Sequence, residues 1–372
     1  MLHPINPPTC ISELEALIGL QQKMLDFAVA NSTYSEAAFR SAVGDDFVNW
    51  LLSISRAGGK VAKPVNSFFQ EFGIYLRFPG AEKNQILQDF ISDQTYYQRI
   101  SDNRFSFSLL PSKSASYTSA STCLIKFYEF LGIGYPLPLV GHPAGASTFK
   151  KVDVINGYKA SNADIEYVCP CCDQTFTDSP GSNEEGYTLD HFFPKSLYPS
   201  ICLHPLNLVP MCSGCNNRKG EIDPLNPTSI PAISVSYNES FHPLARPVRQ
   251  HANLSFQARS SPPDAMMFVS HNPSPTYQNS IAAYKILYQI PDRWETNWKR
   301  VDRQVSSYLQ RALHRLNTPL IDQPLFEAAL QDAITELEGD VGQSHLCYPA
   351  VKWLSWARVN KFQDLMQSFV PS

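Results

Sequence analysis

Apolar residues recur with the period of an α-helix along the N-terminal part of the chain. One such stripe predicts a helix over residues 12–30, with Ser12 as its cap. Another predicts a helix over residues 35–55, capped by Ser35 and ended by Gly58-Gly59. We therefore expect residues 1–150 to form a mostly α-helical domain. The same period predicts three more helices in it, at residues 65–76, 81–100 and 118–131.

The helical period returns toward the C-terminus. It runs over residues 277–316, where Pro291 interrupts it, and it predicts further helices over residues 323–338 and 350–369. Residues 276–372 are therefore expected to form a second α-helical region.

Stretches rich in Pro, Gly, Ser and Asn separate these regions. Residues 229–275 are expected to be irregular, with a small hairpin or two around the extended runs 232–237 and 265–269. The Ser-rich stretch 112–121 is predicted to be a loop, and residues 132–145 are predicted to be a linker.

Two Cys-x-x-Cys pairs lie between the helical regions. Cys169 and Cys172 form the first pair, and Cys212 and Cys215 form the second. Four sulfur ligands in two such pairs are typical of a structural Zn²⁺ site that has no open position. Cys171 is an alternative ligand, although the spacing favours Cys169 with Cys172. The other cysteines are scattered, which argues against a disulfide framework and favours the cytoplasm.

The net charge and the hydrophobic runs of the chain indicate whether it can bind nucleic acid or a membrane. The chain has 372 residues and a formal net charge of −4, which is unfavourable for binding nucleic acid because Lys and Arg neutralise phosphates. A local basic face would have to compensate, and residues 285–315 carry seven Lys or Arg against three Asp or Glu. A solvated helix surface is the alternative. No apolar run is long enough for a membrane span and the start does not resemble a signal peptide, so we expect a cytoplasmic protein without a membrane partner.

Aromatic residues in the N-terminal part offer another route to nucleic acid. They could stack on bases, but large apolar side chains at helical spacing usually form the core, and we expect core positions. They are Phe68, Phe69, Phe72, Tyr75, Phe78, Tyr96 and Tyr97.

The segment around the second cysteine pair carries a recognisable pattern. Residues 189–196 read Leu-Asp-His-Phe-Phe-Pro-Lys-Ser, and residues 207–220 read Asn-Leu-Val-Pro-Met-Cys-Ser-Gly-Cys-Asn-Asn-Arg-Lys-Gly. Together they resemble the HNH (ββα-metal) endonucleases, in the subclass with two Cys-x-x-Cys pairs and an H-N-N motif. The resemblance is dense over residues 187–220. It implies a pair of strands fastened by zinc to a following helix.

The resemblance also implies roles for individual residues. Asp190 would bind a catalytic cation, and His191 would be the general base. Asn207 would brace the loop and help to orient the His, and Asn216 would be the second cation ligand. An amide oxygen is a hard ligand, which suits Mg²⁺ or Mn²⁺ rather than Zn²⁺. Asn217 is an alternative to Asn216.

The position of Asp190 and His191 constrains the strand that carries them. Consecutive strand residues point to opposite faces, so the two can serve one phosphate only where the strand ends and the backbone turns. Pro194 follows shortly after and cannot continue a ladder, which is consistent with such a turn.

Three basic residues are candidates for contact with nucleic acid. Arg218 and Lys219 are expected on the first turn of the helix that begins near Cys215, where phosphates would meet them and the helix N-terminus. Lys195 would contact phosphate in the same way. A solvated position is the alternative for each of these side chains.

The expected fold class is mainly α with a small central ββα-metal (HNH) zinc module. The expected units are an α-helical domain (1–150), the zinc-stabilised nuclease module (151–228), the irregular segment (229–275) and an α-helical C-terminal region (276–372). The helical regions would bind substrate, a partner, or both.

The expected function is metal-dependent hydrolysis of DNA phosphodiester bonds, by nicking or by double-strand cleavage. Similar modules occur in restriction and anti-phage defence, where a partner such as an ATPase can gate the cut. Two other hypotheses stay open at this point. One is a zinc-stabilised scaffold that binds nucleic acid or protein and has a silent site, and the other is an RNA endonuclease. The oligomeric state is not predicted.

Overall fold

The N-terminal part of the chain is a layer of packed helices. In the computed structural model α1 (Ile11–Ala30) packs against α5 (Gly80–Asp93), and α4 (Gly59–Leu76) packs against α6 (Ala115–Ile133). These helices surround one apolar core, as the helical period predicts. The structure describes residues 3–102, 104–143, 145, 147–165, 168–174, 187–229, 232–248, 277–290, 293–294, 298–318, 321–341 and 346–370.

The helix predicted over residues 35–55 is in fact two helices. α2 (Glu36–Val43) ends at Gly44, which has φ 97°, and α3 (Asp45–Ala57) begins directly after it. Because glycine has no Cβ, it adopts this positive φ at little cost, and the chain turns there. The predicted cap is confirmed, since Ser35 Oγ accepts a hydrogen bond from the Ala38 amide at 3.5 Å.

The loop prediction for residues 112–121 is wrong. Ser114 accepts a hydrogen bond from the Tyr117 amide and caps α6, so most of the stretch is the first two turns of that helix. Ser121 Oγ donates to the Tyr117 carbonyl at 2.6 Å, which satisfies a buried hydroxyl inside the helix.

The aromatic residues of this part belong to the core, as predicted. Phe68, Phe72, Tyr75 and Tyr96 are completely buried, and Phe69, Phe78 and Tyr97 pack against the core from partly buried positions. The four buried rings are therefore inaccessible to bases.

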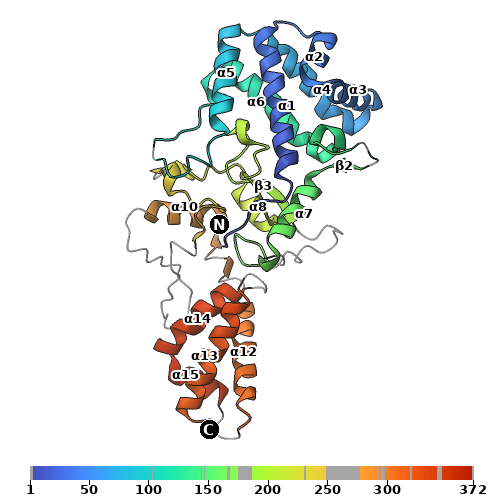
Figure 1. The fold of residues 1–372 in the computed structure, drawn as a ribbon. Coiled ribbons are helices and arrows are strands. Elements are labelled where there is room, and N and C mark those ends of the chain that lie inside the picture. Colours follow the sequence, from blue (N-terminus) through green and yellow to red (C-terminus); the bar gives the residue numbers. More distant parts are fainter. Residues whose placement is uncertain are drawn as a thin grey trace.

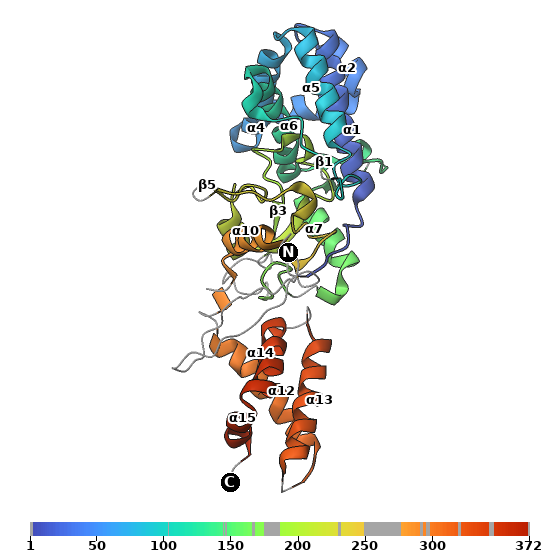
Figure 2. The ribbon, with the colours of Figure 1, turned by 90° about the vertical axis from the view of Figure 1, so that its left-hand side faces the viewer.

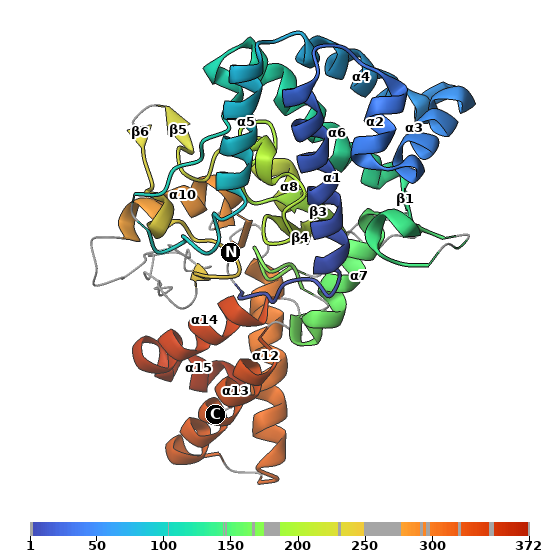
Figure 3. The same ribbon diagram turned by 45° about the horizontal axis from the view of Figure 1, so that its top comes forward.

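A smaller unit of short strands and helices lies below this layer. β1 (Tyr135–Pro136) pairs with β2 (Thr148–Phe149), so the stretch predicted as a linker is partly ordered by pairing. After α7 (Lys151–Ser161), β3 (Tyr187–His191) pairs antiparallel with β4 (Leu208–Cys212), and α8 (Ser213–Lys219) follows directly. In Figure 3 this group lies between the N-terminal helices and the C-terminal ones.

The strand pair shares its core with the N-terminal helices. Tyr128 on α6 donates its hydroxyl to the Leu189 carbonyl of β3 at 3.0 Å, and Gln21 on α1 contacts Cys202 Sγ at 3.5 Å. One apolar cluster contains residues of both parts. The division at residue 150 stays a prediction, while the packing across it is continuous.

A small hairpin follows, as predicted for the irregular segment. It pairs β5 (Thr228–Ser229) with β6 (Ala232–Ile233). The extended run predicted at residues 265–269 lies outside the described residues.

The C-terminal helices form a bundle below the strand pair (Figures 1 and 2). α10 (Gln278–Tyr288) packs on α8, whereas α12 (Trp298–Arg315), α13 (Gln323–Gly339) and α14 (Cys347–Asn360) pack on one another. The last predicted helix is divided at Lys361, after which α15 (Phe362–Phe369) begins. None of the described helices is both long and apolar enough to cross a membrane.

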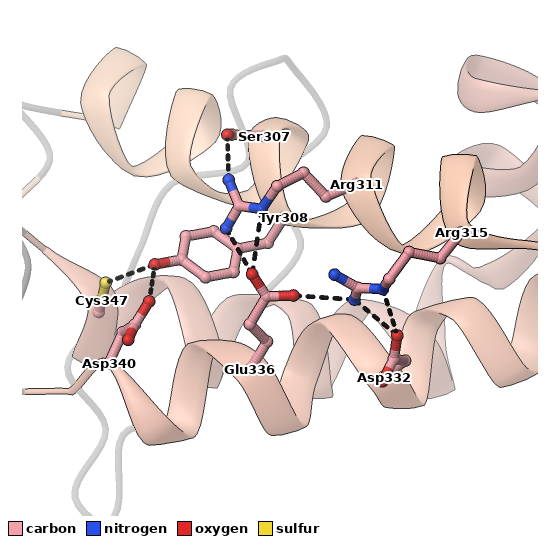
Figure 4. Close-up of polar contacts among 8 residues, drawn as sticks. All are labelled: Ser307, Tyr308, Arg311, Arg315, Asp332, Glu336, Asp340 and Cys347. Atoms are coloured by element: carbon pink, nitrogen blue, oxygen red, sulfur yellow. Dashed lines mark hydrogen bonds and ion pairs between the residues drawn. The ribbon is translucent and has the colours of Figure 1, made fainter.

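Two arginines of the basic face predicted over residues 285–315 are paired with carboxylates of α13. Figure 4 shows Arg311 paired with Glu336 at 2.8 Å, and Arg315 paired with both Glu336 and Asp332. Arg293 is buried elsewhere. The prediction counted charges along one segment, but the facing helix α13 supplies the opposite charges.

Candidate metal centre and the end of strand β3

The four predicted cysteines converge on one point. Their sulfur atoms all lie within 4.8 Å of one another, and every one of the four side chains is buried. The Sγ atoms of Cys169 and Cys215 are 3.8 Å apart, as are those of Cys172 and Cys212. Four sulfurs bound at about 2.3 Å to a tetrahedral ion lie about 3.8 Å apart. The set could therefore hold a metal ion such as zinc.

Local structure explains how the cysteines are positioned. The first pair lies in a tight turn, in which the Cys172 and Asp173 amides both donate to the Cys169 carbonyl. The second pair spans the junction of β4 and α8, where Cys212 caps the helix by accepting from the Cys215 amide at 3.4 Å. Cys171 is buried but lies outside this set of four, and the four are the cysteines that the spacing favours.

Arg293 and Trp294 cover the cysteine site from the C-terminal side. Arg293 Nη1 donates to Cys215 Sγ at 2.8 Å, and Trp294 Nε1 donates to the Cys172 carbonyl at 3.0 Å. A zinc ion with four thiolates has a net charge of about −2, so a guanidinium at this place balances part of it. The sequence reasoning assigned Arg293 to a nucleic-acid face instead. Nothing in the local pattern marks an arginine 78 positions after Cys215 as its partner.

Buried Asp173, in the first cysteine turn, bonds one residue near the N-terminus and one in the C-terminal helices. Asp173 Oδ1 lies 2.7 Å from His3 Nε2, and Asp173 Oδ2 accepts from the Tyr348 amide at 2.8 Å. His3 and Asp173 are completely buried. The turn is therefore held by segments far from it in sequence.

His191 is the last residue of β3, so the strand ends where the sequence required it to end. The Nε2 atom lies 2.9 Å from the Cys202 carbonyl oxygen. A carbonyl can only accept, so Nε2 carries the proton and Nδ1 has the lone pair. The rings of Tyr128 and His191 are arranged edge to face, and their centroids are 4.3 Å apart.

The surroundings of His191 favour its neutral form. Burial lowers the pKa of His191 well below its ordinary value, and the positive charges of Lys195, Lys219 and Lys151 lower it further. The Cys202 carbonyl opposes these effects but does not outweigh them. The imidazole is therefore a neutral base at neutral pH.

Asn207 ties together the two segments that hold His191. Its Oδ1 accepts from the Phe193 amide at 2.8 Å, and its Nδ2 donates to the carbonyls of Phe193 and Ile201 at 3.1 and 3.2 Å. Phe193 belongs to the turn after β3, and Ile201 precedes the residue whose carbonyl holds the imidazole. The fully buried Asn207 thus braces this loop in the manner expected of it.

Asp190 is paired with Lys219. Lys219 Nζ lies 3.0 Å from Asp190 Oδ2, and the lysine side chain is fully buried. Burial raises the pKa of Asp190, whereas the charge of Lys219 lowers it. The expected placement of Lys219 is wrong, because α8 begins at Ser213 and Lys219 lies on its last turn. In this structure its ammonium faces a carboxylate rather than a phosphate.

The other predicted basic residues occupy different surroundings. Arg218 is also on the last turn of α8 and not the first, and its guanidinium donates to the Gly214 carbonyl and to Gln289 Oε1. Lys195 is partly exposed, and its Nζ lies 3.8 Å from Glu221 Oε1 and 5.9 Å from the Tyr128 ring centroid. Among the predicted contact residues, Lys195 is the one whose charge lowers the pKa of His191 most.

Asn216 is half-buried and precedes Lys219 by three positions on α8. Residues three apart are neighbours on a helix surface, so Asn216 is a neighbour of Lys219, the residue of α8 that contacts Asp190. Asn217 is exposed. Within the described part of the chain, the four cysteines are the one group of three or more His, Cys, Asp or Glu side chains with metal-binding spacing. A cation at Asp190 would need most of its oxygen ligands from water or substrate.

A scan against protein-family models, a search of curated proteins and a search of solved structures each find no match to this chain.

Proposed function

We propose that the chain is a metal-dependent endonuclease of the HNH type that hydrolyses DNA phosphodiester bonds. The observation that carries the proposal is His191, whose Nε2 is held by the Cys202 carbonyl while Nδ1 keeps its lone pair. The neighbouring Asp190 lies within reach of α8, and the cysteines flank both. The order β3, β4, α8 is the order that the resemblance implies.

His191 would act as the general base. Attack on a phosphodiester needs a water molecule that loses its proton as it approaches phosphorus. The neutral imidazole would take this proton on Nδ1, and the hydrogen bond to Cys202 would stabilise the imidazolium that forms. Tyr128 and Asn207 keep the ring and its loop in position.

Asp190 and Asn216 would hold the catalytic cation through a carboxylate and an amide oxygen. A bound Mg²⁺ or Mn²⁺ ion would polarise the scissile phosphate and offset its growing charge. Burial raises the pKa of Asp190, and the charge of Lys219 opposes this and favours the ionised form that such a ligand must have. Lys195 is placed to add positive charge near the phosphate.

A supercoiled-plasmid assay tests this proposal. The full chain is incubated with Mg²⁺, Mn²⁺ or EDTA, and His191→Ala is compared with His314→Ala, which changes an exposed histidine on α12. We expect divalent-dependent nicking or linearisation, a loss of roughly 10²- to 10⁴-fold in His191→Ala and no loss in His314→Ala.

Other outcomes would favour the alternatives. Cleavage of RNA but not of plasmid would point to an RNA endonuclease. An inert protein that retains zinc would point to a scaffold or to dependence on a partner such as an ATPase. If His191→Ala cut plasmid as fast as the wild type, the assignment of the base would be wrong.

A further inference from the structure

A cleft of about 590 Å³ opens between the end of α6, one side of α7 and β3. None of the residues assigned to the site above lines it. β3 borders it with Thr188 and Leu189, and the next two residues are Asp190 and His191. α7 lies beside β3 in the fold (Figure 3). Since Leu189 borders the cleft, the cleft ends next to the strand end that carries Asp190 and His191.

The charged residues of the cleft all have the same sign. Lys150, Lys151 and Lys159 line it, and none of its described lining residues is acidic. Two carboxylates lie nearby but outside the lining: Asp153 accepts from the Lys150 amide at 2.7 Å, and Glu129 pairs with Lys126 at 2.8 Å while its charge also acts on Lys151. The cleft is therefore locally positive on a chain with a net negative charge.

Lys151 connects the cleft to the imidazole through one aromatic ring. Its Nζ lies 4.1 Å from the centroid of the Tyr128 ring, and the same ring contacts His191. Burial lowers the pKa of Lys151, and the charge of Lys195 lowers it further. The ammonium groups of Lys151 and Lys195 repel each other, and a bound anion would offset this repulsion.

The rest of the cleft suits the sugar and base portions of a strand. Its lining also includes apolar side chains, among them Val152, which is 44% exposed, and the half-buried Ile155. Tyr187 lies at the edge with Lys159 Nζ 4.6 Å from its ring centroid. Basic grooves with an occasional aromatic ring are the usual track of a nucleic-acid backbone.

We infer that the cleft between α7 and β3 binds the phosphodiester backbone of the DNA strand next to the scissile phosphate, with Lys150 and Lys151 as the principal phosphate contacts. This inference rests on the proposed function for the position of the scissile phosphate. It replaces the C-terminal basic face and the first turn of α8 as the main source of affinity.

Binding and cleavage are measured separately in the test. Anisotropy of a labelled 30-bp DNA duplex is followed in EDTA over a range of salt concentrations, with the full chain and no turnover. Lys150→Ala/Lys151→Ala is compared with Lys60→Ala/Lys63→Ala, which removes the same charge from two exposed lysines of α4. We expect the first pair to weaken binding at least about tenfold and to reduce the salt slope by about two, close to one unit per lost phosphate contact. The α4 pair should leave both nearly unchanged.

A second measurement does not depend on removing charge. Asn156 is exposed on α7 and lines the cleft. A photo-crosslinking residue at position 156 should attach to bound DNA on irradiation, whereas the same residue at Asn66 on α4 should not. Restoring positive charge with Lys150→Arg/Lys151→Arg should restore affinity.

The possible results separate the two proposals. The cleft inference is overturned if the variants Lys150→Ala/Lys151→Ala and Lys60→Ala/Lys63→Ala bind DNA with equal affinity and salt slope. It is also overturned if the residue at position 156 does not crosslink to DNA at saturation. It is overturned as well if the wild type does not bind DNA. If the protein binds DNA through the cleft but never cleaves it, the nuclease proposal is contradicted and the cleft inference is supported.

Discussion

Lys219 Nζ lies 3.0 Å from Asp190 Oδ2, and this contact joins the last turn of α8 to the end of β3. The lysine is fully buried, and the aspartate side chain is only 14% exposed. Each charge is therefore stabilised mainly by the other. A cation that binds Asp190 would compete with Lys219 for the same oxygen atom.

Replacing Lys219 by Met should destabilise the protein in a pH-dependent way. Breaking a buried pair costs about 3 kcal/mol or more, because the remaining charge is uncompensated. The pKa of Asp190 is already raised by burial and should rise further. A raised carboxyl pKa in the folded state destabilises at high pH, and protonation relieves this as the pH falls.

Urea unfolding of Lys219→Met at pH 8 and pH 5 checks this prediction. The loss of stability should be larger at pH 8. The double variant Lys219→Met/Asp190→Asn should recover most of it, since no lone charge remains. Equal losses at the two pH values would contradict the role given to the ion pair.

Removing one cysteine of the tetrahedral set should abolish metal binding. A structural zinc site supplies binding free energy on the order of 10 kcal/mol, so a zinc ion bound there would stabilise the folded chain strongly. Cys212→Ser should therefore contain almost no zinc by elemental analysis and should melt at a much lower temperature. Cys171→Ser is the matched control, because Cys171 is equally buried and lies outside the set of four. Loss of zinc in both variants would place Cys171 among the ligands.

Asn207→Ala should make the orientation of the His191 side chain less restricted while His191 itself is unchanged. The change removes three hydrogen bonds and leaves the buried Phe193 amide without its acceptor, which costs about 1–3 kcal/mol. Nitrogen NMR of the imidazole gives a readout that general destabilisation would not move. We expect the Nε2–H tautomer in the wild type and a mixture of tautomers in Asn207→Ala. An unchanged tautomer with reduced stability would make Asn207 purely structural.

Protein stability should fall in acid partly through His204. Burial lowers the pKa of His204 from 6.5 to about 4, and its Nδ1 accepts from the Leu206 amide at 3.2 Å. A lowered folded-state pKa gives stability that is present above pH 6.5 and lost as the pH falls toward about 4. A shift of this size corresponds to roughly 3 kcal/mol.

The variant His204→Asn tests this pH dependence, because the amide oxygen can replace Nδ1 as the acceptor. Its stability should depend less steeply on pH between 6.5 and 4 than that of the wild type, while the exposed control His314→Asn should follow the wild type. Comparing variants under the same conditions cancels the effect of metal release at low pH. Parallel curves for His204→Asn and the wild type would exclude His204 as a source of the slope.

The parts of the fold that were predictable from sequence are those that local pattern determines. Helical periodicity located α1, α4 and α6, and the cysteine spacing identified the four converging sulfurs, because each signal lies within a few residues. The break at Gly44 depends on a backbone angle that an apolar stripe does not report. The serine stretch was misjudged because its hydroxyl groups bond within the helix.

The errors at the site have a common physical origin. The sequence places Lys219 on the first turn of α8 and counts Arg293 toward a basic face, but each side chain bonds a partner that only the tertiary structure supplies. The contact between His191 and the Cys202 carbonyl depends on the path of the intervening loop, which no short motif encodes. The cleft beside α7 was likewise invisible, because its lysines precede the motif and meet β3 only in three dimensions.

The arginine that covers the cysteine site has a consequence for the order in which the protein forms. Both cysteine pairs are synthesised by residue 215, yet Arg293 and Trp294 are made later, with Arg293 78 positions beyond Cys215. Tyr348, which bonds Asp173 beside the first pair, comes 175 positions after that aspartate. A nascent chain would therefore have all four cysteines before it has the residues that cover them. We expect a ribosome-bound chain that has not yet reached residue 293 to exchange zinc faster than the finished protein.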